Sequence, residues 1–497
     1  MAKVQEKKAE KPEKSKESKN KKDLGITADK DELSEWYTQI LQKAELIEYT
    51  TVSGCYILRP RLYAIWEKVQ NYFDGKIKED GVKNCYFPLF IPESLLLKEK
   101  EHVQGFSPEV AWVTQTGDTP LNEKLAIRPT SESIIYPAYA KWIRSYRDLP
   151  LRLNQWCNVV RWEFKHPLPL LRSREFLWQE GHTAFATKQE ADAEAYKIQD
   201  LYARTFREMY ALPIIKGRKT HKEKFAGADY TLTTEAFLPS GKSAQAATSH
   251  HLGQNFSKAF NIKFKTPQQK EEFVWQNSWG LSTRSIGIAI MMHSDNKGLI
   301  LPPKVASPQA IIIPIFSDEK EKAIILKEAE KIKGFLSEIE IEIDSRDQTP
   351  GFKFNDAELK GIPIRIELGP RDIKENQVVI ARRDSSSKET VKIKDLKSKL
   401  QQTLEDIQNN LYKKAEFHLK SSTIKTKNIQ EARQAIQSKK LVKTAWCGSQ
   451  ECEDNIKAET GGAKVICILE SEKVSSQDKC VNCQQSAQHI IYIAKSY

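Results

Sequence analysis

The sequence predicts three folded parts: an α+β domain on an antiparallel sheet, a smaller α/β domain, and a C-terminal α/β module with a cysteine cluster. Between residues 31 and 295, strand-like and helix-like patterns alternate irregularly, with Pro and Gly punctuation and clustered Trp, Arg and His. From residue 309 onward the alternation is regular, and five of the eight cysteines lie after residue 446. Irregular mixing is typical of α+β domains, and regular alternation is typical of α/β domains.

The composition limits the class of protein. The chain has 497 residues, 39% hydrophobic and 29% charged, which suits a folded protein of two to four domains and excludes disorder throughout. Its apolar runs are much shorter than the ~20 residues that a membrane helix needs, and no signal-peptide pattern is present. We therefore expect a cytoplasmic protein that makes no use of a membrane.

The charge favours an anionic partner. The net charge is +12, which suits a nucleic acid, although excess lysine also serves solubility. Nine Lys and four Glu fall within residues 1–22, with hardly an apolar side chain among them. We expect residues 1–23 to form a disordered Lys-rich tail that contacts a nucleic acid or a partner protein, or only solvates the chain.

The first domain, residues 24–297, contains one clear amphipathic helix. Five apolar residues at helical spacing predict a stripe that is either core or a subunit interface. They are Leu62, Ile65, Trp66, Val69 and Phe73. A strand-like run, NCYFPLFIP, follows at residues 84–92.

Residues 161–182, RWEFKHPLPLLRSREFLWQEGH, read as strand, loop and strand. Alternate strand residues share a face, so Arg161 and Glu163 are expected together, with Arg172 in the loop. The face of the second strand carries Phe176, Trp178, Glu180 and His182. Such a face offers cations for phosphates, an aromatic plate for a base and acceptors for an amine; the alternative is a salt-bridged surface hairpin.

Three other segments supply similar groups. RPTSE, residues 128–132, places a hydroxyl and a carboxylate where they suit a cationic amine, and AQAATSHHLGQNFS, residues 244–257, sets polar side chains among small residues. In NSWGLSTRSIGIAIMMHSD, residues 277–295, Arg284 opens an apolar helix and is expected to meet an anion such as a triphosphate. Together these segments are suited to bind an amino acid and a nucleotide.

The second domain is expected over residues 298–400. GLILPPKVASP, from residue 298, reads as a linker because of its prolines. A strand at 309–316, a helix to about residue 337, and isoleucine alternation at 339–343 and 364–368 then predict a mixed α/β domain. A helix with one apolar face leads into the C-terminal module, residues 401–497; that face carries Leu400, Leu404, Ile407 and Leu411.

The terminal cysteines have the spacing of a metal site. Cys447 and Cys452 form C-x4-C, and Cys480 and Cys483 form C-x2-C, a pattern that can wrap thiolates around tetrahedral zinc. The alternative is four unrelated reduced thiols. Cys467, inside an apolar run, reads as a core strand residue.

Several strings resemble those of a known family. VKNCYFPLFIP, RWEF with RSREFLWQEGH, and GLSTRSIG resemble motifs 1, 2 and 3 of class II aminoacyl-tRNA synthetases. RPTSE, SREFLWQEGHTAF, ATSHHLGQNFS and NSWGLSTR resemble prolyl-tRNA synthetases of the eukaryotic and archaeal type. The resemblance runs from about residue 24 to residue 497, with TPGFKFNDAELKGIPIRIELGPRD matching the anticodon-binding domain.

The resemblance implies an activity and partners. It implies ligation of L-proline to tRNA(Pro) with ATP, through a prolyl-adenylate, releasing AMP and pyrophosphate. It also implies Mg²⁺, structural Zn²⁺, a homodimer through motif 1, and tail contacts with a multisynthetase assembly or another partner. In this family the terminal tyrosine, here Tyr497, reaches towards the active site.

The resemblance also implies residue roles. The catalytic residues are Arg161, Arg172 and Arg284. The proline-binding residues are Glu109, Thr130, Glu132, Arg161, Trp178, His182, His250, Ser278 and Gly280. The ATP-binding residues are Arg161, Glu163, Arg172, Phe176, Gln245, Thr248, Ser282 and Arg284. Gln245 and Glu235 are implied for Mg²⁺, and the four terminal cysteines for Zn²⁺.

Two further expectations and two alternatives follow. Only about 100 residues separate His182 from Arg284, too few for the editing insertion of bacterial-type members, so we expect alanine misactivation without hydrolysis of Ala-tRNA in cis.

Basic residues of the second domain are candidates for tRNA contacts: Arg346, Lys353, Lys360, Arg365 and Arg371. The alternatives are a threonyl or histidyl synthetase, and a catalytically inactive tRNA-sensing protein.

Overall fold

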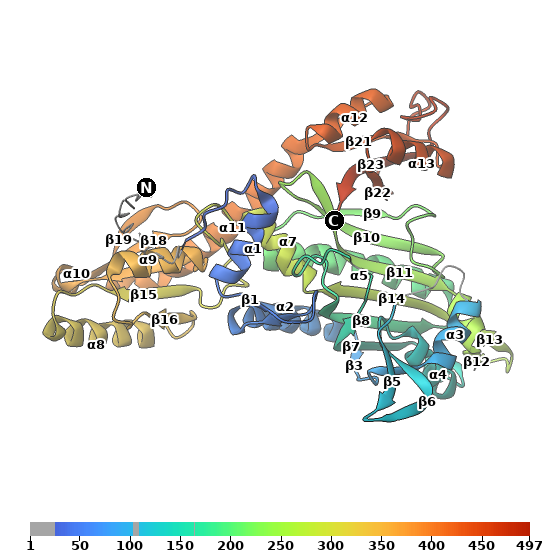
Figure 1. The fold of residues 1–497 in the computed structure, drawn as a ribbon, viewed down its shortest axis with the longest axis horizontal. Coiled ribbons are helices and arrows are strands. Elements are labelled where there is room, and N and C mark those ends of the chain that lie inside the picture. The colour runs from blue at the N-terminus through green and yellow to red at the C-terminus, as the bar shows by residue number, and fades with distance from the viewer. Residues whose placement is uncertain (1–24, 103–108, 164) are drawn as a thin grey trace, which may run out of the picture.

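The computed structural model describes residues 25–102, 109–163 and 165–497, so the tail expected at residues 1–23 lies outside the described residues. The first domain, blue to green in Figure 1, lies beside the yellow and orange second domain. The C-terminal module, in red, sits above the first domain. Helix α11 (Leu396–Ser422) runs from the second domain to this module.

The first domain is built on antiparallel strands covered by helices, as the sequence predicts. Its helices are α1 (Leu33–Lys43), α2 (Pro60–Glu79), α3 (Glu93–His102), α4 (Glu132–Trp142), α5 (Lys188–Tyr210), α6 (Asn255–Phe260) and α7 (Arg284–His293). Its strands are β1 (Ile47–Tyr49), β2 (Tyr56–Leu58), β3 (Lys83–Asn84), β4 (Phe90–Pro92), β5 (Trp112–Thr116), β6 (Thr119–Ile127), β7 (Leu151–Val160), β8 (Glu175–Phe185), β9 (Ile215–Arg218), β10 (Tyr230–Phe237), β11 (Lys242–Gly253), β12 (Lys263–Lys265), β13 (Glu271–Phe273) and β14 (Trp275–Ser282).

The C-terminal module continues the sheet of the first domain. Its elements are β20 (Thr423–Lys425), α12 (Ile429–Gln437), β21 (Leu441–Trp446), α13 (Gln450–Glu459), β22 (Lys464–Ile468) and β23 (His489–Ser496). The strand order is β20-β21-β23-β22-β9-β10-β11-β14-β8-β7-β3. The module joins where Ile468 pairs with Arg218 and where Lys495 and Ser496 run parallel to Lys242 and Ser243.

Helix α5 supports the back of this sheet. A capping box between Thr187 and Glu190 starts the helix, which satisfies free backbone N–H groups of the first turn. The helix ends at Ala211 in the left-handed conformation. One face of α5 is buried and contacts β10, β11 and β14. The opposite face of the sheet is thereby left open for a site.

The apolar stripe predicted for residues 62–73 lies on α2 and is buried in the same core as α5. Of the two alternatives for it, the core is confirmed. Helix α7 starts at Arg284, and residues 285–291 are all buried, as the sequence predicts for an apolar helix.

The second domain has the predicted mixed α/β fold. Its sheet order is β16-β15-β17-β18-β19, with β15 parallel to β16 and β17 and the remaining pairs antiparallel. The elements are β15 (Ala310–Pro314), α8 (Glu319–Phe335), β16 (Ile341–Ile343), α9 (Pro350–Leu359), β17 (Ile364–Leu368), α10 (Pro370–Lys374), β18 (Gln377–Arg382) and β19 (Lys388–Lys392). The described residues also include two short 3-10 helices, at Tyr146–Asp148 and Ile393–Asp395.

Two expectations about local structure were wrong, and a third feature, the expected linker, is more buried than its prolines suggest. The run at residues 84–92 is not one strand, because Phe87 donates its N–H to the Gln155 side chain instead of to a neighbouring strand. Residues 161–163 form a turn after β7 rather than a strand. The proline-rich stretch at 298–308 has no helix or strand, but it is packed into the protein: Leu299, Leu301 and Val305 are at most 4% exposed.

Among the described residues, no helix combines the length and the apolar character that crossing a bilayer requires.

Candidate active site

A pocket of about 270 Å³ opens on the face of the sheet opposite α5. Strands β8, β14, β11 and β10 lie side by side beneath it. Their register aligns His182, Ser278, His250 and Thr231, one from each strand, in a row across the floor. Because alternate strand residues share a face, Glu180, Gly280 and Thr248 form a second row beside the first.

One end of the pocket presents carboxylates. The Thr130 hydroxyl donates to the Glu132 carboxylate, and the two residues are 7% and 2% exposed. Glu132 is the first residue of α4, where the helix dipole favours a negative charge. This end can hold a cationic amine without an additional base.

A buried pair, Glu180 and His182, lines the same pocket, and the charge of Glu132 acts on His182. Burial opposes the charge on each, but their mutual hydrogen bond outweighs this effect together with other interactions: Ser131 and Gln155 also donate to Glu180, and the charge of Glu132 favours the protonated form of His182. The pKa of Glu180 is therefore lowered and the pKa of His182 is raised. His250 differs: burial, then the charges of Arg161 and His182, lower its pKa to about 3, so it is neutral.

The other end of the pocket presents two guanidinium groups. Arg161 lies 5.5 Å from the ring centroid of Phe176 and 5.2 Å from that of Trp178, and its Nε donates to the Pro129 carbonyl over 2.9 Å. Burial and the charge of Arg161 lower the pKa of Arg284 to about 10, which still leaves it charged at neutral pH. Two cations that face one pocket stabilise an anion bound between them.

Several buried polar atoms of the pocket lining lack a hydrogen-bond partner in the part of the chain that the structure describes, and one of them is a hydroxyl. The Ser278 Oγ is buried on the pocket floor and has no hydrogen-bond partner among the described residues. A buried hydroxyl without a partner is unfavourable, so this atom is suited to a polar ligand atom.

Comparisons with known proteins agree with this geometry. The tRNA synthetase class II core domain (G, H, P, S and T) matches residues 113–293, the anticodon binding domain matches 309–403, and the prolyl-tRNA synthetase C-terminal domain matches 429–497. The proline--tRNA ligase of Oceanobacillus iheyensis is 47% identical, over 95% of this chain and 98% of that protein. The chain belongs to the prolyl-tRNA synthetase family.

Other prolyl-tRNA synthetases are equally similar. The cytoplasmic proline--tRNA ligase of Arabidopsis thaliana is 48% identical, over 98% of this chain and 93% of its own. The crystal structure of the Cryptosporidium parvum prolyl-tRNA synthetase, complexed with halofuginone and AMPPNP, has a TM-score of 0.92 and 47% identity, covering 95% of this chain and all of that chain. The chain spans 31% of the bifunctional glutamate/proline--tRNA ligase of Cricetulus griseus, at 53% identity over 90% of this chain.

Most residues implied by the prolyl-tRNA synthetase resemblance meet in this pocket. The predicted residues that line it are Thr130, Glu132, Arg161, Phe176, Trp178, His182, Gln245, Thr248, His250, Ser278, Gly280, Ser282 and Arg284.

Four predicted residues lie outside the lining. Glu109 is exposed and contacts the turn after β7, where its carbonyl accepts from Trp162 N over 3.1 Å. Glu163 is exposed in that turn, but its charge acts on Arg284, as does that of Arg172. Glu235 lines an adjoining smaller cavity together with Gln245, Arg284 and Tyr497.

The pocket also has lining residues that the sequence interpretation missed, chiefly Glu223 and Phe225. They lie in a Lys-rich stretch between β9 and β10 that shows no strand or helix periodicity. The Phe225 ring centroid lies 4.6 Å from that of His250. The only sequence feature that could have indicated this wall of the pocket is one aromatic residue, Phe225, in the run KEKF.

The C-terminal residue lies close to the pocket. The Tyr497 N–H donates to the Ser243 carbonyl over 3.1 Å, and its hydroxyl donates to Ser240 Oγ over 3.0 Å. The position agrees with the expectation that Tyr497 reaches towards the active site.

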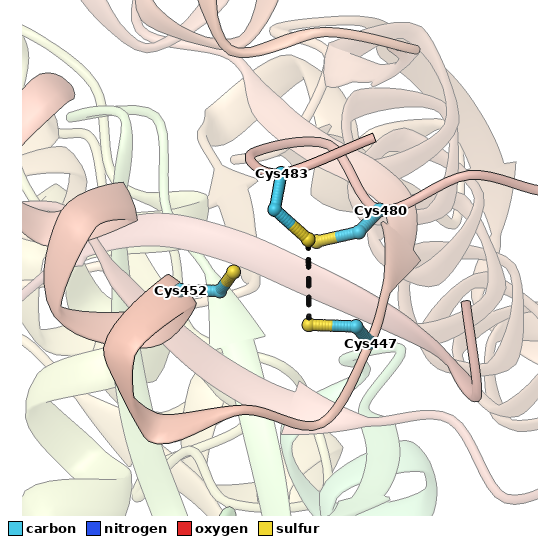
Figure 2. A group of neighbouring side chains, drawn as sticks. All are labelled: Cys447, Cys452, Cys480 and Cys483. Carbon is cyan, nitrogen blue, oxygen red and sulfur yellow. Dashed lines mark hydrogen bonds between the residues drawn. The ribbon is translucent and has the colours of Figure 1, made fainter. Parts of the chain in front are cut away.

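The four terminal cysteines converge in space (Figure 2). Their sulfur atoms all lie within 4.8 Å of one another, and Cys447 Sγ and Cys483 Sγ are 3.9 Å apart. Zinc–sulfur bonds of about 2.3 Å in a tetrahedron place the sulfurs about 3.8 Å apart, so the donor set fits zinc. Cys467 is buried in β22, away from this cluster, as predicted for a core strand residue.

The basic residues proposed for tRNA contact are largely engaged within the protein. Lys353 is 1% exposed and donates to the Asp344 carbonyl, so the expectation that it meets tRNA was wrong. Arg346, Lys360 and Arg365 form ion pairs with carboxylates. Arg371 is exposed and remains a candidate.

Proposed function

We propose that this chain ligates L-proline to tRNA(Pro) in two steps, using ATP to form a prolyl-adenylate and releasing pyrophosphate and then AMP. The observation that carries the proposal is a single pocket with carboxylates at one end and the guanidinium groups of Arg161 and Arg284 at the other. Proline carries an amine and a carboxylate, and ATP carries the phosphates, so the pocket complements both substrates.

Amino-acid recognition is assigned to the carboxylate end. The secondary ammonium of proline is held by Thr130 and Glu132. Arg161 meets the carboxylate of proline, while Trp178 and neutral His250 enclose the ring. The unpartnered Ser278 Oγ offers a hydrogen bond to the bound substrate.

The first step requires positioning more than acid–base chemistry. The carboxylate of proline is already a nucleophile and attacks the α-phosphorus of ATP, and pyrophosphate leaves. Arg161 and Arg284 neutralise the charge that develops on the phosphate oxygens, and Phe176 and Arg284 hold the adenine. Arg172 and Glu163, close enough to affect Arg284 electrostatically, are assigned to the outer phosphates and the adenine amine.

Mg²⁺ is assigned to Gln245 and Glu235, which stand opposite each other between β11 and β10. An amide and a carboxylate oxygen are of the ligand type that Mg²⁺ prefers, together with water and phosphate oxygens. The Glu235 carboxylate already accepts hydrogen bonds from Lys219, Thr233 and Ser243, which orient it. The ion would supply further charge neutralisation at the phosphates.

In the second step the 3′-terminal adenosine hydroxyl of tRNA attacks the adenylate carbonyl, which gives Pro-tRNA and AMP. The anticodon-binding domain, with Arg371 exposed, is assigned to the other end of the same tRNA.

The decisive test is proline-dependent exchange of pyrophosphate into ATP, measured beside alanine, threonine and histidine. Replacing one electrostatic stabiliser typically costs about 10²- to 10³-fold in rate, so Arg161→Ala should lose at least that much. Arg147→Ala, which removes an exposed arginine stacked on Tyr146, should leave exchange unchanged. Threonine- or histidine-dependent exchange would indicate another synthetase, and no exchange with any amino acid would indicate an inactive tRNA-binding protein.

We further propose Zn²⁺ at the four cysteines, a cytoplasmic location, and contacts of the Lys-rich tail with a multisynthetase assembly or another partner. The last is supported by relatives that carry a second synthetase in one chain. The similarity to the cytoplasmic proline--tRNA ligase of Arabidopsis thaliana supports the location.

A homodimer is proposed from motif 1 and the hairpin before it, where large apolar side chains are exposed. These are Tyr49, Val52, Ile57, Tyr63, Tyr86 and Phe90. Exposed apolar side chains in one region favour a protein interface. Light scattering of the wild type should give twice the chain mass, and Tyr86→Lys with Phe90→Glu should give a monomer.

A further inference from the structure

A segment between β9 and β10, residues 219–229, forms one wall of the active-site pocket through Glu223 and Phe225. The Phe225 N–H donates to Thr231 Oγ1 over 2.9 Å, and Thr231 Oγ1 lies 2.9 Å from Nδ1 of His250. The position of this segment therefore affects the surroundings of His250, at the amino-acid end of the pocket.

The segment is held by the C-terminal domain rather than by its own domain alone. Lys219 Nζ donates to the Ile466 carbonyl of β22 over 2.9 Å. Lys464, in the same strand, pairs with Glu223 at 3.0 Å. The ion pair between Lys464 and Glu223 is partly exposed, so its contribution to holding the segment is small.

One contact in this set is buried. Thr220 Oγ1 donates to Glu453 Oε1 over 2.8 Å, with the two residues 1% and 6% exposed. The Thr220 carbonyl accepts hydrogen bonds from the N–H groups of Glu223 and Lys224. Thr220 therefore stabilises the turn that begins the segment. Glu453 lies in the first turn of α13, one residue after Cys452 of the cysteine cluster.

We propose that Glu453 is a positioning residue of the proline site. By accepting the Thr220 hydrogen bond from the C-terminal domain, it holds the segment where Phe225 packs against His250. The inference rests on the proposed function. The adenine end of the pocket, with Phe176 and Arg284, is carried by β8 and α7 and does not depend on this contact.

The expected effect is therefore selective. Glu453→Ala should raise the KM for proline in pyrophosphate exchange by about five- to twentyfold and the KM for ATP by less than about twofold. Glu453→Gln, which keeps a carbonyl acceptor for Thr220, should restore the wild-type KM for proline. Thr220→Val should match Glu453→Ala, and combining the two should add nothing, because both remove one interaction.

The matched control is Glu451→Ala, which changes an exposed carboxylate in the same turn of α13 and should leave both KM values unchanged. Hydrogen exchange gives a readout independent of activity: in Glu453→Ala, residues 219–229 should exchange faster while α5 keeps its protection.

Three results would each overturn the inference. They are a wild-type KM for proline in Glu453→Ala, an equal rise of the KM for proline and the KM for ATP, and an unchanged rate of hydrogen exchange in residues 219–229. If the wild-type protein shows no proline-dependent pyrophosphate exchange, the proposed function is wrong. Hydrogen exchange would still decide whether Glu453 holds the segment.

Discussion

Glu180 and His182 form a buried pair on one face of β8, with Oε2 and Nε2 3.0 Å apart and each side chain 2% exposed. Burial disfavours both charges. Hydrogen bonds from His182, Ser131 and Gln155 nevertheless hold the pKa of Glu180 below its ordinary 4.5. The hydrogen bond to Glu180, helped by the charge of Glu132, holds the pKa of His182 above 6.5.

The pair predicts how stability depends on pH. His182, with a raised pKa, contributes stability that is fully present below pH 6.5 and is lost as the pH rises through its folded pKa. Glu180, with a lowered pKa, contributes stability that is present above pH 4.5 and is lost as the pH falls through its folded pKa. The contribution is therefore largest between these two values.

Glu180→Gln should reduce the loss of stability that occurs as the pH rises above 6.5. Without the carboxylate, the pKa of His182 should fall, so less stability remains to be lost above pH 6.5. Melting temperatures near pH 6 and pH 8.5 measure the effect, and the exposed Glu175→Gln on the same strand is the control. If the melting temperature of Glu180→Gln differs between pH 6 and pH 8.5 by as much as that of the wild type, the assignment is wrong.

Gly181 is required by packing behind the pocket. A Cβ at this position would lie 2.1 Å from Cε2 of Trp279, a ring that is 1% exposed and cannot move aside. Gly181→Ala should destabilise the protein by at least about 1–3 kcal/mol, the usual cost of overpacking. Thermal denaturation checks this.

The control for Gly181 is Gly334→Ala on α8, where a new Cβ meets nothing within 4 Å. It should stabilise the helix by about 0.5–1 kcal/mol, because alanine restricts the unfolded chain more than glycine does. A Gly181→Ala protein as stable as the wild type would show that the contact with Trp279 relaxes freely.

Metal analysis should find one zinc ion per chain. Cys452→Ser and Cys483→Ser should each lower the zinc content and the melting temperature, since a structural zinc site contributes directly to folding. Cys55→Ser, in the loop between β1 and β2, should change neither. Purified wild-type protein without zinc, with an unchanged melting temperature after chelation, would contradict this assignment.

Alanine should be activated and then retained on tRNA. Between β8 and α7 the chain forms only α5, α6 and strands of the catalytic domain, which leaves no separate editing domain there. A pocket that fits proline rejects alanine only weakly, by about 1–3 kcal/mol for each missing methylene. Exchange with alanine and the lifetime of Ala-tRNA measure this, and rapid deacylation by the purified protein would show an editing site elsewhere.

The sequence predicted what depends on local periodicity. Phe176, Trp178 and His182 share the pocket because a strand alternates its side chains, and this pattern is visible in the residues themselves. Arg161 was placed on a strand for the same reason, wrongly. Pairing of β7 with β8 ends at Val160 and Glu175. Arg161 still donates its N–H to the Arg174 carbonyl, but Trp162 donates its N–H to the Glu109 carbonyl instead, so the chain leaves the sheet.

Contacts between distant parts of the chain were not predictable in this way. Glu223 and Phe225 lie in a polar stretch whose place depends on α13 and β22, more than 200 residues later in the chain. Nothing in the local pattern indicates such a partner. The buried proline-rich stretch at 298–308 was missed for a related reason, because its apolar residues pack against the first domain without forming a helix or strand.

The shared sheet has a consequence for synthesis on the ribosome. β9 ends at Arg218 and its neighbour β22 begins at Lys464, 246 positions later, yet the two strands pair. Until those later residues emerge, the growing chain carries a catalytic sheet with an unpaired edge, which exposes it to aggregation and proteolysis. A chain that ends before residue 464 is thus distinguished by this unpaired edge from one that contains β22 and β23.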